Sequence, residues 1–199
     1  MKKNYILFII YVIVMFFTVY SKVEASYHIY LPVFNNETRF TRGVKNTCYY
    51  VDYTASKYTK YINRAAKSWA TLDNKIKNTA VASSKGTHID FYAQNFPSQM
   101  GIVAYTSFFD DKGEQVNLGE NDYDGPVKNY FYTDIIADSG QNSFLVDEAV
   151  MAHEMGHAYG LRHYQMTTET IMWPGVDVVP ATTPQKVDND AINYLYPNG

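Results

Sequence analysis

The sequence predicts an α+β fold, and three observations indicate this class. Segments rich in strand-forming residues lie between turn signals through the first two thirds of the chain, and tyrosine, which favours strands, accounts for 19 of the 199 residues. One helical pattern lies among these segments, and two more follow them. Hydrophobic residues make up 46% of the chain, which is enough for a packed core, and the single cysteine excludes both an internal disulfide and a cysteine-clustered zinc site.

The first 25 residues are typical of a signal peptide. A short positive head, Met-Lys-Lys, precedes an uncharged apolar run over residues 5–20, and residues 23–25 (Val-Glu-Ala) place small side chains where a signal peptidase cleaves. The run is slightly shorter than the roughly 20 residues that a spanning helix needs, although an uncleaved anchor is the alternative. We therefore expect a secreted, extracellular protein with no stable membrane association after cleavage.

The remaining chain is predicted to form one domain, because no repeat, low-complexity tract or linker divides it. Residues 26–46 are polar and irregular, which indicates an N-terminal extension or a short pro-segment, and residues 47–199 carry the regular elements. The formal net charge of −3 makes nucleic acid a poor partner, because phosphate binding requires a basic surface. We expect a monomer.

Strand formers and one helical pattern occupy the first part of this domain. Residues 47–53 predict a strand, and Ser56 or Thr59 could cap a helix that runs to about Leu72 with its apolar side chains on one face. Three further strands and two turns are expected, the strands at residues 87–92, 102–109 and 130–136 and the turns at residues 111–113 and 124–126.

Two helices are expected in the last third of the chain. The first covers residues 144–159, with Ser143 as its cap and Gly160 at its end. The second begins at Thr183-Pro184, because a capping residue followed by proline is typical of a first helical turn.

The most informative segment is residues 153–163, His-Glu-Met-Gly-His-Ala-Tyr-Gly-Leu-Arg-His. Side chains four residues apart share one face of a helix, so His153 and His157 can bind one metal ion. Gly160 lets the chain leave the helix sharply, which can bring His163 back as a third nitrogen ligand. Three protein ligands leave a fourth position for water, which is the arrangement of catalytic rather than structural zinc.

Glu154 is the expected catalytic residue. Zinc lowers the pKa of its water towards roughly 7, so Glu154 can take a proton as this water attacks a peptide carbonyl and can then pass the proton to the departing amine. The prediction is an endopeptidase with one catalytic Zn²⁺ that acts on protein or peptide substrates. The alternative is a catalytically idle zinc protein that binds a partner through the cleft, and replacement of Glu154 distinguishes the two.

These residues resemble the long zinc-binding signature of the metzincin metallopeptidases. That family places a methionine in a tight turn under the metal, and Met172, within Ile-Met-Trp-Pro, resembles this Met-turn. Among metzincins the chain is most similar to the matrixins, the matrix metalloproteinase type, and the similarity is strongest over residues 143–197. It implies a twisted mixed sheet with an active-site helix and a C-terminal helix, with residues 47–199 as the catalytic domain. Another metzincin subfamily is the nearest alternative.

The resemblance also implies where substrate binds. Residues 101–105 are similar to the edge strand above the cleft, which receives substrate as an antiparallel strand. The segment after the Met-turn forms the outer wall of the main specificity pocket in matrixins, and Val176 stands where the family usually has tyrosine. This implies a medium or large apolar side chain just after the scissile bond. The implied substrate-binding residues are Ile102, Val103, Ala104, Tyr105, Pro174, Gly175 and Val176.

The chain departs from vertebrate matrixins in several respects. Those enzymes bind a structural zinc with three further histidines, whereas only His28 and His88 remain here outside the motif, so we expect no second zinc. Their large pro-domain with its cysteine switch is missing, which leaves the role of Cys48 and any latency function of residues 26–46 open. Acidic residues at 110–111 and 122–124 could bind Ca²⁺, although acidic residues beside glycine usually form turns.

Overall fold

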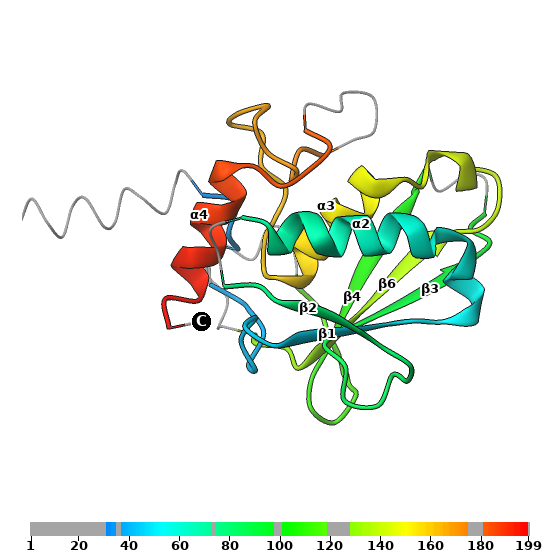
Figure 1. Ribbon diagram of the computed structural model, residues 1–199, viewed down its shortest axis with the longest axis horizontal. Helices are drawn as coiled ribbons and strands as arrows, with labels where there is room; N and C mark the ends of the chain where they lie inside the picture. The colour runs from blue at the N-terminus through cyan, green and yellow to red at the C-terminus, as the bar shows by residue number, and fades with distance from the viewer. Residues whose placement is uncertain are drawn as a thin grey trace, which may run out of the picture. The chain divides into compact units, whose positions relative to one another are not determined.

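A computed structural model describes residues 31–34, 37–72, 75–97, 101–118, 128–174 and 181–198. From Pro32 onwards these residues belong to one unit, which is built on a six-stranded mixed sheet with helices on one of its faces (Figure 1). The predicted α+β class is therefore confirmed.

The sheet combines a parallel part with an antiparallel edge. Strand order is β2-β1-β3-β6-β4-β5, in which β2, β1, β3 and β6 are mutually parallel and β4 runs antiparallel to β6. β5 pairs only with Phe108 and Phe109 of β4. The strand bounds are Thr47–Val51 (β1), Asn78–Val81 (β2), Ile89–Gln94 (β3), Ala104–Phe109 (β4), Gln115–Val116 (β5) and Tyr132–Asp138 (β6).

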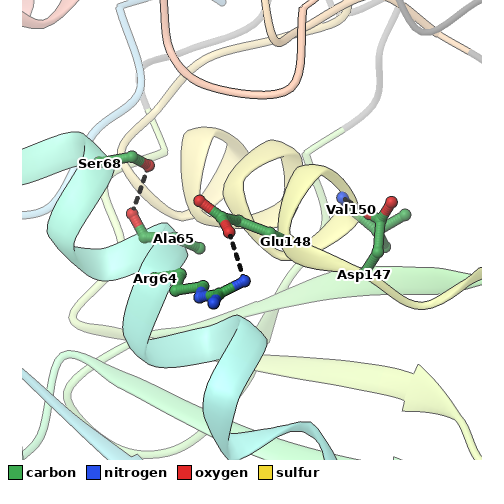
Figure 2. Close-up of polar contacts among 6 residues, drawn as sticks. All are labelled: Arg64, Ala65, Ser68, Asp147, Glu148 and Val150. Carbon is green, nitrogen blue, oxygen red and sulfur yellow. Dashed lines mark hydrogen bonds and ion pairs between the residues drawn. The ribbon is translucent and has the colours of Figure 1, made fainter.

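Helices α2 (Thr59–Ala70) and α3 (Glu148–Ala158) pack against each other on one face of this sheet, which we call the helix face. The helical pattern of the sequence explains the contact, because the buried side chains of α2 recur at helical spacing and end at Trp69. The Trp69 indole Nε1 donates to the Ala152 carbonyl across the interface at 2.9 Å. Arg64 and Glu148 form an exposed ion pair beside it, with Nη1 and Oε2 3.8 Å apart (Figure 2).

The predicted strand bounds shift by up to two residues, and the helix starts also need correction. Residues 53–58 form a 3₁₀ helix (Tyr53–Tyr58) that is capped by Asp52, and α2 begins at Thr59, the later of the two expected positions. A 3₁₀ turn (Ser143–Leu145) precedes α3, whose cap is Asp147 rather than Ser143, because the Asp147 side chain accepts from the Val150 N–H at 3.0 Å (Figure 2).

The last helix, α4 (Lys186–Leu195), also begins later than Thr183. Its cap is Gln185, which forms a reciprocal capping box with Asp188. Strands β2 and β5 were not predicted, because β2 is a short edge strand with mostly exposed side chains and β5 has only two residues. Neither shows the buried alternation that identifies a strand in a sequence.

The segment before β1 is tied to the rest of the unit. Val33 forms an antiparallel bridge with Leu161, and Phe40 forms a parallel bridge with Tyr130. Val33 and Phe40 are both buried, as is Val44. The assignment of residues 26–46 to an extension or a pro-segment stays a prediction, and removal of these residues would break the contacts just described.

Candidate metal centre

Three histidine side chains converge beside the C-terminal half of α3. His153 and His157 lie on the helix four residues apart, as the motif predicts, and His163 follows the turn that ends it. The Nε2 atom of His163 lies 3.2 Å from that of His153 and 3.3 Å from that of His157. Of the residues that the structure describes, only these three bring together enough potential ligand atoms for a metal ion.

The geometry of the three nitrogens fits zinc. With Zn–N distances near 2.0–2.1 Å, tetrahedral coordination requires nitrogens about 3.3–3.4 Å apart, which is close to the spacing found here. His153 Nδ1 lies 2.7 Å from the Ile171 carbonyl oxygen, and His157 Nδ1 lies 2.8 Å from the Leu161 carbonyl oxygen. A carbonyl oxygen only accepts, so each Nδ1 carries the proton and each Nε2 lone pair is directed to the shared centre.

Burial also favours the neutral imidazole that a metal requires. The pKa of His157 is well below its usual value, chiefly because burial disfavours the charged ring and also because His153 and His163 are close. A neutral imidazole has the free lone pair with which His157 could bind a divalent ion.

Gly160 makes the turn to His163 possible. Its φ of +96° lies in the left-handed region, where a side chain is disfavoured, and a Cβ atom would meet the Thr38 carbonyl oxygen at 2.7 Å. The Leu161 N–H then donates to the Gly156 carbonyl at 3.0 Å, which closes the end of α3. The Leu161 carbonyl is thereby fixed where it can accept from His157.

Met172 lies in a turn packed beneath the histidines. It is fully buried, and a Cβ atom on Gly156 would lie 2.3 Å from its Sδ atom, so the glycine in the motif allows the two segments to approach. The turn is held from α4: Asp188 accepts from the Thr170 hydroxyl at 2.5 Å and from the Ile171 N–H at 3.0 Å. Asp188 therefore orients the segment whose carbonyl fixes His153.

Glu154 is buried beside the histidines, at 6% exposure. Burial raises its pKa above the usual carboxyl value, while the electrostatic effect of the adjacent His153 and a hydrogen bond from Thr106 act in the opposite direction. The Thr106 hydroxyl donates to Glu154 Oε2 at 2.6 Å. The residue expected to act as general base is thus enclosed and held at one oxygen.

The strand expected to receive substrate borders this site. Because β5 covers only Phe108 and Phe109, the part of the chain that the structure describes leaves Ala104–Ser107 without a strand partner on its outer side. Ile102, Ala104 and Tyr105 are half-buried and Val103 is buried; Ile102 and Val103 precede β4 rather than belonging to it. Pro174 is half-buried after the Met172 turn, and Gly175 and Val176 lie outside the described residues.

Of the acidic residues considered for calcium, only those at 110–111 are among the described residues. Asp110 Oδ1 accepts from the main-chain N–H groups of Lys112 and Glu114, at 2.9 and 2.8 Å, so its described contacts are those of a turn. Residues 122–124 lie outside the described residues.

The family of this chain is identified by comparison with a family profile. The profile described as Matrixin matches residues 37–197, more than half of the chain. The chain belongs to the matrixin family. No curated protein matches it closely enough to report as a relative. The match confirms the resemblance inferred from the zinc signature and is consistent with the mixed sheet and helices seen here.

Matrixins are metallopeptidases, and the histidine triad supplies the ligand set that such an enzyme needs. Among the residues described here, no helix combines the length and the apolar character required to cross a membrane.

The sequence placed Thr106 only along a substrate strand and Asp188 only in a terminal helix. The available signal for Thr106 was a polar residue that alternates with Ala104 and Phe108 on one face of the strand.

Proposed function

We propose that this matrixin is a secreted zinc-dependent endopeptidase. One observation carries the proposal: the His163 Nε2 atom lies 3.2 and 3.3 Å from those of His153 and His157, beside a buried glutamate and next to a strand edge that can pair with an extended chain. His153, His157 and His163 would hold one zinc ion, and the tautomers set by the Ile171 and Leu161 carbonyls suit that role.

A bound zinc ion would polarise the substrate carbonyl and make a water molecule acidic near neutral pH. Glu154 would accept the proton of that water as the water attacks the peptide carbon, and would then donate this proton to the nitrogen of the leaving amine. Its burial suits both steps, because a pKa raised by burial brings the carboxyl closer to working pH than that of an exposed glutamate.

Substrate would bind extended and antiparallel along the free edge of β4, through main-chain hydrogen bonds. Ile102, Val103, Ala104 and Tyr105 would contact it there. Pro174, Gly175 and Val176 would line the site of the side chain that follows the scissile bond, with a preference for a medium or large apolar group.

Hydrolysis of an unfolded protein such as casein by residues 26–199 tests the proposal. A peptidase would be supported if a zinc chelator abolishes cleavage and added zinc restores it. The Glu154→Ala variant should then lack cleavage while it retains one zinc per chain. Full zinc occupancy without cleavage would favour latency through residues 26–46 or the idle zinc protein. N-terminal sequencing of secreted material tests the export step, and we expect it to begin near Ser26.

A further inference from the structure

Thr106 is a polar residue on the helix face of β4, between Ala104 and Phe108. Its hydroxyl oxygen lies 2.6 Å from Glu154 Oε2 and 3.1 Å from the Glu154 main-chain oxygen. The contact joins residues 48 positions apart in the sequence, and it connects the sheet edge directly to the active-site helix.

We propose that Thr106 is a positioning residue for Glu154, which rests on the endopeptidase function proposed above. Its hydroxyl fixes Oε2 and so leaves the other carboxylate oxygen for the reacting water. Both described hydrogen bonds of the Thr106 hydroxyl are to Glu154, so Thr106 acts through that residue.

The buried setting makes such a contact effective. A glutamate side chain has three rotatable bonds, and a carboxylate that moves among several rotamers spends little time in the productive one. A hydrogen bond to a charged acceptor is stronger than a neutral one, and it is strengthened further where water is excluded. No other hydrogen bond reaches the Glu154 carboxylate from the residues that the structure describes.

A hydroxyl is also suited to a partner that exchanges a proton during turnover. It donates to the carboxylate form, and when it turns towards the Glu154 main-chain oxygen it can accept from the carboxylic acid. Valine has nearly the same shape and can do neither, whereas serine can do both.

The position of Thr106 couples two parts of the reaction. The same strand, β4, offers the free edge along which substrate is proposed to lie, so the register of the substrate and the orientation of the general base share one rigid element. A site built on a strand is held more precisely than one built on a loop.

Kinetics of Thr106→Val and Thr106→Ser, measured on a quenched fluorescent peptide with the zinc-loaded enzyme, test the proposal. We expect Thr106→Val to lower kcat roughly 10–100-fold with KM changed less than about twofold, and Thr106→Ser to restore most of kcat, because general base catalysis contributes about 10²–10⁴-fold. Thr133→Val is the matched control: Thr133 is a fully buried strand threonine that lies away from Glu154, and its loss should leave kcat unchanged.

A second arm separates positioning from a structural role. In a Glu154→Gln background, Thr106→Val should cause no further loss of the residual activity, because its effect passes through the carboxylate. A crystal structure of zinc-loaded Thr106→Val should show the Glu154 side chain in a different rotamer while the three histidines keep their positions. Thr106→Ala replaces the valine variant if the latter does not fold.

The proposal is overturned by an unchanged kcat in Thr106→Val, by a serine variant as slow as the valine variant, or by additive losses in the double variant. A failure of the Thr106 proposal can be distinguished from a failure of the proposed endopeptidase function. If Glu154→Gln itself leaves hydrolysis intact, the endopeptidase mechanism is wrong, whatever Thr106 does.

Discussion

The two faces of the sheet hold buried carboxyl groups in opposite settings. On the helix face, Glu154 accepts a hydrogen bond from Thr106 and adjoins three histidines. On the other face, Asp90 of β3 and Asp134 of β6 stand directly opposite each other in register, so two like charges lie on neighbouring strands. Asp90 Oδ1 accepts from the Thr87 hydroxyl at 2.5 Å, whereas Asp134 Oδ1 is buried without a hydrogen-bond partner among the described residues.

Burial is the main cause of a raised pKa in all three carboxyls, but their other neighbours differ. Burial raises the pKa of Asp90 and of Asp134 to about 6, and for Asp134 the charge of Asp90 adds to this. The other described groups that act on Tyr92 and Tyr132 beside this pair are Asp52, Asp110 and Tyr50, which are acidic or phenolic. A raised pKa alone therefore does not identify a catalytic carboxyl. Glu154 is distinguished by its neighbours, which are the three histidines proposed to bind zinc and the Thr106 hydroxyl that donates to it.

The largest expected difference between the faces concerns metal binding. His163→Ala should lose zinc and all measurable hydrolysis, because two imidazoles do not replace three in a catalytic site. His88→Gln changes the one described histidine outside the cluster and should keep one zinc per chain. Metal analysis of the dialysed variants checks both; equal zinc content in the two would contradict the assigned ligands.

Removal of one charge from each face should produce the next largest contrast. Glu154→Gln should lower kcat about 10²–10⁴-fold without loss of zinc, since it removes the general base. Asp134→Asn, which is equally conservative, should leave kcat within about twofold. Steady-state kinetics on one peptide compares them, and a comparable loss in Asp134→Asn would show that the outer pair takes part in the reaction.

Packing beneath the histidines should give a smaller effect. A methyl group at position 156 would overlap Met172 Sδ and approach Trp69, so Gly156→Ala should lower the free energy of unfolding by about 1–3 kcal/mol and also reduce activity. Gly86→Ala is the control, because an added Cβ there meets nothing and only its φ of +76° opposes the change, at about 1 kcal/mol. Denaturant unfolding measures both; equal losses with full activity would place Met172 elsewhere.

The smallest expected effect is a pH dependence of stability, caused by Asp90 and Asp134 on the outer face. Carboxyls whose pKa is about 6 in the fold and about 4 when unfolded bind more protons in the folded state between those values, so their contribution to stability falls as pH rises through this window. Asp134→Asn removes one charge of the pair and should raise Tm at pH 8.

The difference in Tm between Asp134→Asn and the parent protein should shrink towards zero near pH 4. Loss of zinc at acid pH affects both proteins alike, so the difference isolates the carboxyl pair. Thermal unfolding at matched pH values measures this difference in Tm. A difference in Tm that does not vary with pH would show that the charges of Asp90 and Asp134 do not destabilise the fold.

The sequence alone was enough to identify the metal ligands, the general base and the Met-turn as candidates. His153 and His157 are four residues apart on a helix, and Gly160 is a local signal for the turn that follows, so short-range geometry already predicts the convergence of three imidazoles that the structure shows. The α+β class and the family follow from patterns of the same local kind. The caps at Asp147 and Gln185 were missed because several polar residues precede each helix and compete for the same position.

The contacts that give these residues their properties were decided only in three dimensions. Thr106 reaches Glu154, Asp188 reaches Ile171, and Asp90 faces Asp134 across gaps of 48, 17 and 44 positions, and nothing in the local pattern of either partner names the other. Periodicity tells which face of an element is buried, but the register between strands and the packing of helices on them determine which buried groups meet. Those contacts distinguish Glu154, the proposed general base, from Asp134, whose charge is expected only to lower stability as pH rises.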